Sequence, residues 1–573
     1  MTSNFFRTFM QNYLTHLLFQ FRVLYRVFLL RVIDLELLAS DGDPTQLMGQ
    51  FAAVFATISF FSAFPVPYLL VDPRPIPVAL AYMFEHYLIE TTMTIAGLIA
   101  VLSWDSAFPD RRDVLVLGPL PVRRATFFLA KLAALFAAPA LAIAAFNLFT
   151  GFSWPMVFAV GHGKYSLLRT LPIYWFTMFA AGAFFVFTVL AVQGLAANLL
   201  PRQLFLRLSA VLQAAALCLL LTLYFLGPSF NSPAALAAPQ NQHVLRWLPA
   251  YWFLGLFNQL NGGHHPETAA LAHRAWLALG LSGLGTVAAL LLSYFRTLPR
   301  IVEQPDILPA TRGLALSFGS SLSSVITLFS LRTLLRSRQH RMILSFYVGI
   351  GLTVILGFTH TKFVQSAAAE SASPNNTTIN TIFLLASILT VSLAVLALRV
   401  VIAIPITLRA NWIFRLTQAR PAYAYHRATR LSLLLLGVLP VLLVLSVALF
   451  SHYSPRFILG HLLAMALLGT LTVELCLFTF QKIAFACSYL PGKANLHFAF
   501  WAALFAATYW LKQVADFEGR MLNNRNDFLC MIAVLAAAAL GLHLATSLHA
   551  RNTEQLIFEE DALPEIVSLK LNS

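Results

Sequence analysis

The sequence Trp104-Asp-Ser-Ala-Phe-Pro-Asp-Arg-Arg-Asp-Val-Leu-Val-Leu-Gly-Pro-Leu-Pro-Val-Arg-Arg124 is a polar block between two long apolar runs. It contains seven charged residues and three prolines. Apolar runs of this length are typical of helices that cross a membrane, so the block connects two such helices. A short uncharged turn would be enough for that purpose. We therefore interpret residues 104–125 as a shaped cytoplasmic surface to which a soluble protein binds.

Composition places the whole chain among membrane proteins. Of its 573 residues, 59% are hydrophobic and 11% are charged, whereas soluble domains have about 25% charged residues. A helix needs about 20 apolar residues to cross the hydrocarbon core, so the chain has room for many spans. The net charge of +15 does not predict a nucleic-acid partner, because the basic residues lie at the edges of apolar runs. In that position they orient helices in a lipid bilayer.

The predicted fold class is all-α, a polytopic membrane protein with about 12 transmembrane helices, because lipid offers no partners for open backbone groups. The predicted spans are 51–71, 82–103, 126–150, 172–199, 208–228, 273–295, 342–359, 380–406, 431–450, 457–480, 496–511 and 528–548. Residues 313–331 are Ser-rich, and we interpret them as an interfacial helix. A span there would move the basic cluster Arg332–Arg341 to the outside, against the positive-inside rule.

The charge pattern predicts that both termini are cytoplasmic, in a multi-pass protein of the cell inner membrane. With the N-terminus inside, most Lys and Arg residues fall on the cytoplasmic side, as the positive-inside rule requires. The first 35 residues are predicted to be an amphipathic interfacial helix, because at about 100° per residue their polar side chains gather on one face. These side chains are Asn4, Arg7, Gln11, Thr15, Arg22 and Arg26.

The chain is predicted to be a duplication, with one six-span half at 1–300 and a second at 301–573, which ends in a short acidic tail. Each half begins with an interfacial helix, followed by two spans and a large basic cytoplasmic loop, 104–125 or 407–430. Landmarks recur at an offset near 300: Pro121 with Pro421, Lys131 with Arg430, and Pro139 with Pro440. An even number of spans per half predicts parallel repeats about an axis along the membrane normal.

The sequence contains no recognisable catalytic or nucleotide-binding motif. Gly163-Lys164 and Gly492-Lys493 lack the earlier glycine and the following Ser or Thr of a phosphate-binding loop. The four cysteines lie in or beside apolar runs without paired spacing. We therefore predict that the chain is not an enzyme, has no metal site and binds no cofactor itself.

Carboxylates inside membrane spans are costly and are therefore candidate functional groups. Glu85 lies near the outer end of the second predicted span, whereas Glu90 and Glu474 lie deeper. Glu90 and Glu474 either line a possible translocation path or form structural pairs with Lys131 or Arg399.

The plan of an interfacial helix, two spans, a charged cytoplasmic turn, four more spans and an aromatic outer element resembles the permease subunit of ABC-2 type exporters. The stretch Asp113-Val-Leu-Val-Leu-Gly-Pro-Leu-Pro-Val122 is similar to that family's coupling loop. The resemblance covers nearly the whole chain, twice. It implies an ATP-binding cassette ATPase in the cytoplasm as partner, in two copies, with ATP bound at that partner.

The resemblance also assigns the residues that would contact the ATPase. The implied coupling residues are Phe108, Pro109, Asp110, Arg111, Arg112, Asp113, Pro119, Pro121, Asn411, Trp412, Phe414 and Arg415. The usual subunit has six spans and forms a dimer, whereas here both halves are fused. The second loop differs from the first, which implies two unequal ATPase contacts.

The function expected from these features is that of a permease for an ATP-driven exporter. One alternative is a proton-coupled secondary transporter that uses Glu90 or Glu474. Another is a membrane-embedded transferase acting on a lipid-linked sugar, which would need more acidic and basic residues in its outer loops. The aromatic run Trp247–Phe257 predicts an outer-leaflet interfacial helix, either an anchor or a lid over a substrate exit.

Overall fold

The computed structural model describes most of the chain and divides it into two compact units, Met1–Thr311 and Arg312–Ser573. The described residues are 17–29, 44–64, 66, 78–104, 120, 122–162, 166–230, 246–263, 266–293, 322–337, 340–352, 381–404, 422–450, 455–478, 484–485, 513–521 and 524–552. Within these ranges every regular element is a helix. The all-α prediction is therefore confirmed for the described part of the chain.

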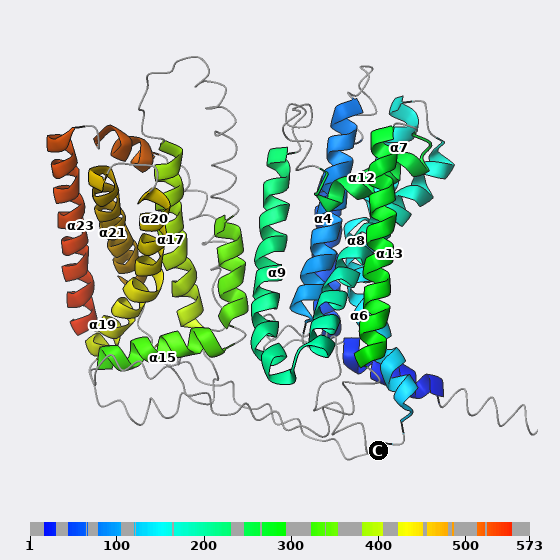
Figure 1. Cartoon of the computed structure of the whole chain (residues 1–573), viewed down its shortest axis with the longest axis horizontal. Coiled ribbons are helices and arrows are strands. Elements are labelled where there is room, and N and C mark those ends of the chain that lie inside the picture. Colours follow the sequence, from blue (N-terminus) through cyan, green and yellow to red (C-terminus); the bar gives the residue numbers. More distant parts are fainter. Residues whose placement is uncertain are drawn as a thin grey trace, which may run out of the picture. The chain divides into compact units, whose positions relative to one another are not determined.

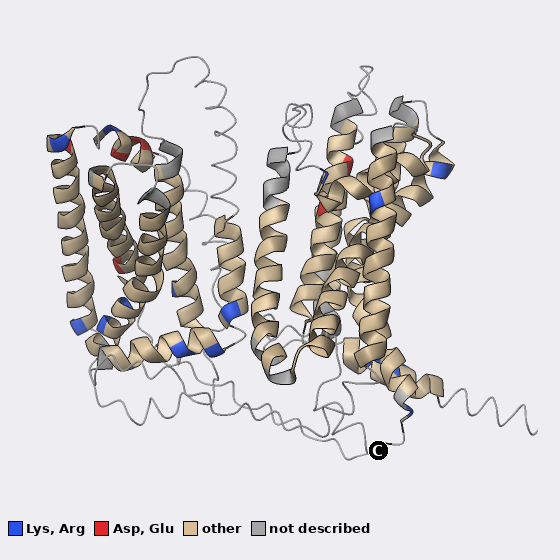
Figure 2. Cartoon of the chain, in the orientation of Figure 1, with Lys and Arg blue, Asp and Glu red and all other residues tan. Residues whose placement is uncertain are grey.

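Seven of the described helices are long and apolar enough to cross a membrane. They are Ala125–Phe146, Leu167–Leu199, Thr268–Leu292, Leu384–Ala403, Tyr423–Val447, Phe457–Phe478 and Arg525–Arg551. Each overlaps a predicted span. Figure 2 shows how sparse charged residues are along the long helices. These properties are compatible with a multi-pass membrane protein, and the count of twelve spans stays a prediction.

The first unit is a helical bundle in which α8 packs against both α4 and α13 (Figure 1). Its helices are α2 (Pro44–Ala63), α4 (Val78–Leu102), α6 (Arg124–Phe146), α7 (Thr150–His162), α8 (Leu167–Leu199), α9 (Arg202–Phe230), α12 (Pro249–Leu260) and α13 (Pro266–Leu292). One continuous hydrophobic core joins residues of α4, α6, α7, α8, α12 and α13. The helix at 17–29 packs on α6 through Leu24 and Phe28.

The second unit places α21 between α17 and α23. Its labelled helices are α15 (Leu322–Arg336), α17 (Thr381–Ala403), α19 (Ala422–Leu433), η4 (Leu434–Val438), α20 (Leu439–Phe450), α21 (Pro455–Phe478) and α23 (Arg525–Asn552). The π-helical turn η4 ends two residues before Pro440, whose ring and missing N–H disturb regular α-helical bonding. Figure 1 shows α15 running crosswise to α17 and α23.

The two units share one order of helix contacts. In the first, α8 contacts α4 and α13, and in the second, α21 contacts α17 and α23. In both units a short helix from earlier in the chain packs against the helix that follows the charged loop. The helix at 17–29 packs against α6, and α15 packs against α19. This agreement is expected of a duplicated bundle.

Some element boundaries differ from the sequence-based expectation. Residues 150–162 form α7, where the sequence predicted part of an outer loop. With 13 residues α7 is too short to match a span pattern. The interfacial helix expected at 313–331 is described from Leu322 and extends to Arg336 as α15. The aromatic helix expected at Trp247–Phe257 is present as α12, with Pro249 at its first turn, where a missing N–H costs nothing.

Candidate functional site

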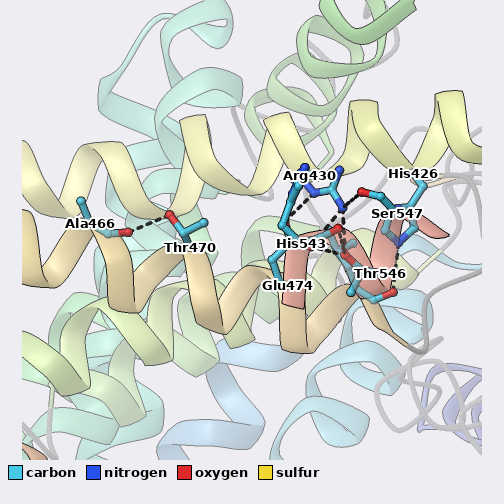
Figure 3. Close-up of polar contacts among 9 residues, drawn as sticks. His426, Arg430, Ala466, Thr470, Glu474, His543, Thr546 and Ser547 are labelled. Atoms are coloured by element: carbon cyan, nitrogen blue, oxygen red, sulfur yellow. Dashed lines mark hydrogen bonds and ion pairs between the residues drawn. The ribbon is translucent and has the colours of Figure 1, made fainter. Parts of the chain in front are cut away.

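Glu474 is the buried centre of a polar cluster in the second unit (Figure 3). Its Oε1 lies 2.7 Å from Arg430 Nε and 2.8 Å from His543 Nδ1. Its Oε2 accepts hydrogen bonds from Thr546 Oγ1 at 2.6 Å and from Arg430 Nη2 at 3.0 Å. The Nε contact is an ion-pair distance without hydrogen-bond alignment. Both carboxylate oxygens are therefore fully occupied, by side chains from α19 and α23.

The basic partner of Glu474 is Arg430 rather than Lys131 or Arg399. The Nζ of Lys131 lies 5.6 Å from the ring centroid of Phe28. Arg399 donates from Nε to the carbonyl oxygen of Cys476 at 3.0 Å. The sequence placed Arg430 in a loop, but α19 begins at Ala422 and carries it inside the bundle. Glu474 is thus a structural ion-pair centre that joins three helices.

The acidic end of α4 has the opposite character. Glu85 and His86 are both buried, with 0% and 2% of their surface exposed. Among the described residues, neither carboxylate oxygen of Glu85 and neither ring nitrogen of His86 has a hydrogen-bond partner. His86 Nδ1 lies 3.8 Å from Glu90 Oε2, too far for a hydrogen bond. Buried polar groups are paired in nearly all proteins, so this concentration of unpaired groups calls for a functional explanation.

The helix α12 packs against this end of α4. The rings of Tyr251 and His86 lie 4.0 Å apart between centroids, and Tyr82 donates a hydrogen bond to Asn258 Oδ1 at 3.2 Å. On its other side, α12 approaches α13 so closely that a Cβ on Gly255 would lie 2.9 Å from the carbonyl oxygen of Thr268. The polar groups of α4 are therefore covered by a short aromatic helix that is itself held by α13.

Below this end, polar side chains link α4 to α6 and α8 in a fully buried chain. Asn147 donates from Nδ2 to Thr92 Oγ1 at 3.1 Å and accepts at Oδ1 from the hydroxyl of Tyr174 at 3.0 Å. The side chain of Asn147 is therefore paired at both its nitrogen and its oxygen, whereas the buried side-chain atoms of α4 that lack a hydrogen-bond partner belong to Glu85 and His86.

The second unit has a buried acid–imidazole pair at the corresponding place in the chain, before its last helix. Glu518, in the helix at 513–521, lies with Oε1 2.7 Å from His461 Nδ1 in α21. Both side chains are almost completely buried. Here the short helix supplies the carboxylate itself, whereas α12 supplies an aromatic ring to the imidazole of His86.

The residues at both ends of the first charged loop are held by contacts with neighbouring helices. Trp104, the first residue of the first loop, donates from Nε1 to Ser209 Oγ at 2.9 Å. Its carbonyl oxygen accepts a bond from Gln193 Nε2 in α8. Near the other end of the loop, Val122 packs into the cluster of the helix at 17–29. The ends of this loop are thus connected to α8, α9 and α6.

The second loop has comparable anchors. Ile404 precedes it, and its carbonyl oxygen accepts a hydrogen bond from His340 Nε2 at 2.9 Å. His340 Nδ1 lies 2.6 Å from Ser337 Oγ, and the His340 ring meets Phe485 edge-on at 5.1 Å. After the loop, α19 packs against α15.

The twelve coupling residues implied by the family resemblance lie outside the described residues. They are Phe108, Pro109, Asp110, Arg111, Arg112, Asp113, Pro119, Pro121, Asn411, Trp412, Phe414 and Arg415. Of the predicted site residues, Glu90 and Glu474 are described, in separate units. Sequence reasoning placed Glu85 at the outer interface and did not predict that Glu85 and His86 would be buried without partners.

Within the described residues, no group of three His, Cys, Asp or Glu side chains is arranged to hold a metal ion. No protein family, characterised protein or solved structure matches this chain. The function is therefore inferred from the residues and their geometry.

Proposed function

We propose that the chain is the membrane-spanning permease of an ATP-driven exporter of the ABC-2 type. In this proposal it has twelve spans in two fused six-span halves and lies in the cell inner membrane with both termini in the cytoplasm. Two separate cytoplasmic ATPase subunits bind and hydrolyse ATP. The chain itself binds no cofactor and catalyses no reaction.

The observation that carries this proposal is the anchoring of both charged loops. Trp104 connects one end of loop 104–125 to α9 through Ser209 and to α8 through Gln193. His340 connects the start of loop 407–430 to the end of α15 through Ser337. A loop held in this way transmits a force to the bundle instead of absorbing it, because its end groups are buried and hydrogen-bonded.

ATP binding would close the two ATPase subunits and displace the loops together. The displacement would favour one of two arrangements of the six-span halves, so that the energy enters as a population shift between conformations. Each loop contacts its ATPase differently, because Asn411-Trp-Ile-Phe-Arg415 and Asp110-Arg-Arg-Asp113 differ in charge.

The translocation path in this proposal passes the acidic end of α4. Glu85 and His86 offer hydrogen-bonding capacity that the described residues leave unused, Glu90 lies 3.8 Å from His86, and an intramembrane ionisable group is a functional candidate by default. Movement of α12 away from His86 would expose these groups to a substrate near the outer end of the unit. In this proposal Glu474, also a possible path residue on sequence grounds, has a structural role instead, which is supported by the side chains that occupy both of its oxygens.

Co-purification with the partner ATPase tests this proposal. Reversing the charge in the first loop with Arg111→Glu and Arg112→Glu should reduce recovery of the ATPase several-fold, because a network of exposed charges contributes up to a few kcal/mol. Arg551→Glu, at the exposed end of α23, is the matched control and should leave recovery unchanged. Equal recovery of the ATPase with the unmodified chain, the double charge-reversal variant and the Arg551→Glu control would rule out this loop as the contact.

A proton-coupled secondary transporter is the second candidate, because the unpaired carboxyl of Glu85 and the neighbouring Glu90 could carry a proton. Reconstituted vesicles separate the two functions. The exporter requires the ATPase and ATP, and a pH gradient alone should drive no transport. Transport driven by a pH gradient without any ATPase, and abolished by Glu85→Gln or Glu90→Gln, would replace the exporter with the proton-coupled function.

A further inference from the structure

Two helices in different units carry the same short sequence. Leu18-Phe-Gln-Phe-Arg-Val-Leu-Tyr-Arg26 and Leu328-Phe-Ser-Leu-Arg-Thr-Leu-Leu-Arg336 have the same residue at five of nine positions. The shared residues are the first leucine, the phenylalanine, both arginines and the leucine between the arginines. Both stretches are helical, in the helix at 17–29 and in α15. Each packs, within its own unit, against the helix that follows a charged loop: the helix at 17–29 against α6, and α15 against α19.

The shared residues also have the same environment in each unit. Leu24 and Leu334 are buried, with 8% and 9% of their surface exposed, in the clusters that hold these helices on α6 and α19. The shared phenylalanines are exposed: Phe19 has 66% of its surface accessible and Phe329 has 36%. In both units, therefore, the shared phenylalanine is exposed and the shared leucine is buried.

Helical geometry places both arginines on the side that faces away from the protein. At about 100° per residue, positions two before and two after a buried residue lie almost opposite to it. Arg22 and Arg26 therefore lie opposite Leu24, and Arg332 and Arg336 lie opposite Leu334. All four arginines are exposed. The shared phenylalanine, five positions before the leucine, lies beside the arginine pair on the same outward side.

No acidic side chain of the described residues forms an ion pair with these arginines. Each pair therefore offers its guanidinium groups to a ligand outside the described chain. An arginine fork matches phosphate geometry, and an exposed phenylalanine beside it is suited to the acyl boundary of a membrane. The combination favours a ligand with a phosphate and an adjoining hydrocarbon chain.

We propose that Arg22 with Arg26 and Arg332 with Arg336 form two equivalent binding sites for the headgroup phosphate of an anionic phospholipid. Phe19 and Phe329 insert beside the lipid's acyl chains. A membrane surface presents the same phosphate group to any helix that lies on it, so one class of ligand accounts for both copies of the sequence. These sites are independent of any ATPase, so the proposal stands or falls separately from the proposed function.

Lipid binding to the purified full-length chain in detergent tests these sites. After delipidation, the chain is titrated with phosphatidylglycerol or phosphatidylcholine, and the bound lipid is counted by native mass spectrometry. Each arginine near an anionic surface contributes about fivefold in affinity. Arg22→Gln with Arg26→Gln, or Arg332→Gln with Arg336→Gln, should each weaken one phosphatidylglycerol site about 25-fold by that measure.

Control chains separate these sites from general charge effects. Arg520→Gln with Arg525→Gln removes two exposed arginines elsewhere in the second unit and should leave phosphatidylglycerol binding unchanged. Substitution of the proposed arginines by lysine should retain part of the affinity, because the charge remains while the planar fork is lost. These lysine variants keep the test open if a glutamine variant does not fold.

Several outcomes would overturn the proposal. Equal binding of phosphatidylcholine and phosphatidylglycerol by the unmodified chain would show that the headgroup charge is not recognised. Equal competition by inorganic phosphate and by phosphatidylglycerol would identify a free anion, rather than a lipid, as the ligand. Equal loss in the Arg520 and Arg525 control would assign binding to net charge. Unchanged binding after both arginine pairs are replaced would leave no role for the shared sequence.

Discussion

Two buried acidic regions of this protein differ in how their charges are satisfied. In the second unit, the carboxylate of Glu474 is surrounded by Arg430, His543 and Thr546 within 3.0 Å. In the first unit, the buried carboxyl of Glu85 has no hydrogen-bond partner among the described residues. The same residue type therefore occurs in two environments, one in which both carboxylate oxygens are bonded across helices and one in which neither is.

Two imidazoles of the protein differ in the same way. Both ring nitrogens of His340 have partners, Ser337 Oγ and the carbonyl oxygen of Ile404, whereas neither ring nitrogen of His86 has one. An unpaired buried polar group costs roughly 1–3 kcal/mol. A region that retains this cost in two adjacent side chains is a stronger candidate for function than one in which every group is paired.

Removing Arg430 should have the largest effect on stability. In Arg430→Gln the carboxylate of Glu474 remains buried without its charged partner, and breaking a buried ion pair in this way costs about 3–5 kcal/mol. Thermal unfolding in detergent should show a large loss. The double variant Arg430→Gln with Glu474→Gln should recover much of it, because no buried charge remains.

Arg427→Gln is the matched control for this change, since Arg427 lies on the same helix but is exposed. It should alter stability by less than about 0.5 kcal/mol, as is usual for surface positions. A loss from Arg427→Gln as large as that from Arg430→Gln would contradict a specific role for the Glu474 cluster.

Replacing Glu85 should have a smaller effect of the opposite sign. Glu85→Leu removes two unpaired buried oxygens and keeps the side chain about the same size, so the variant should be more stable by about 1–3 kcal/mol. If the acidic end of α4 lines the translocation path, transport should fall in the same variant. This combination is the usual trade-off between stability and activity.

The corresponding change in the second unit, Glu474→Leu, should destabilise the protein, because it leaves Arg430 buried without a counter-charge. The sign difference between the two variants is the sharpest test of the comparison. Equal destabilisation by Glu85→Leu and Glu474→Leu would mean that Glu85 has a structural partner and is not available to a substrate.

The sequence predicted helices better than it predicted contacts. Apolar length and the cost of open backbone groups in lipid were enough to predict spans such as 172–199 and 457–480, which match α8 and α21 closely. The partner of Glu474 was not predicted, since the sequence offered only Lys131 and Arg399 as possible counter-charges and Arg430 is the one in contact. Arg430 precedes the apolar run that begins at Leu431, and only the packing of α19, α21 and α23 brings the two side chains together.

The unpaired state of Glu85 and His86 could not be predicted from sequence either. Local periodicity gives the face of a helix on which a side chain lies, but not whether another helix supplies a donor to it. Here α12 supplies the aromatic ring of Tyr251 to His86. In the second unit, the helix at 513–521 supplies the Glu518 carboxylate to His461, although both short helices precede the last helix of their unit.

Acidification should produce the smallest of these effects, through His340. Burial lowers the pKa of His340 below its usual value of 6.5, although the bond to the carbonyl oxygen of Ile404 opposes the shift. His340 precedes the predicted span 342–359. Because the folded state holds the imidazole neutral, the unfolded state binds more protons once the pH falls below about 6.5, and stability then decreases. The expected loss is at most about 1.4 kcal/mol per unit of pKa difference.

The variant His340→Gln isolates this contribution, because glutamine retains a hydrogen-bonding side chain but does not titrate. Thermal unfolding of both proteins at pH 7.5 and pH 5 should show that the stability advantage of the unmodified chain shrinks on acidification. A difference between the two proteins that does not change with pH would contradict the assignment of a neutral, paired imidazole to His340. A neutral, paired His340 is also the basis of the contrast with His86. A protonated His340 would need a negative partner, and no acidic side chain of the described residues forms an ion pair with it.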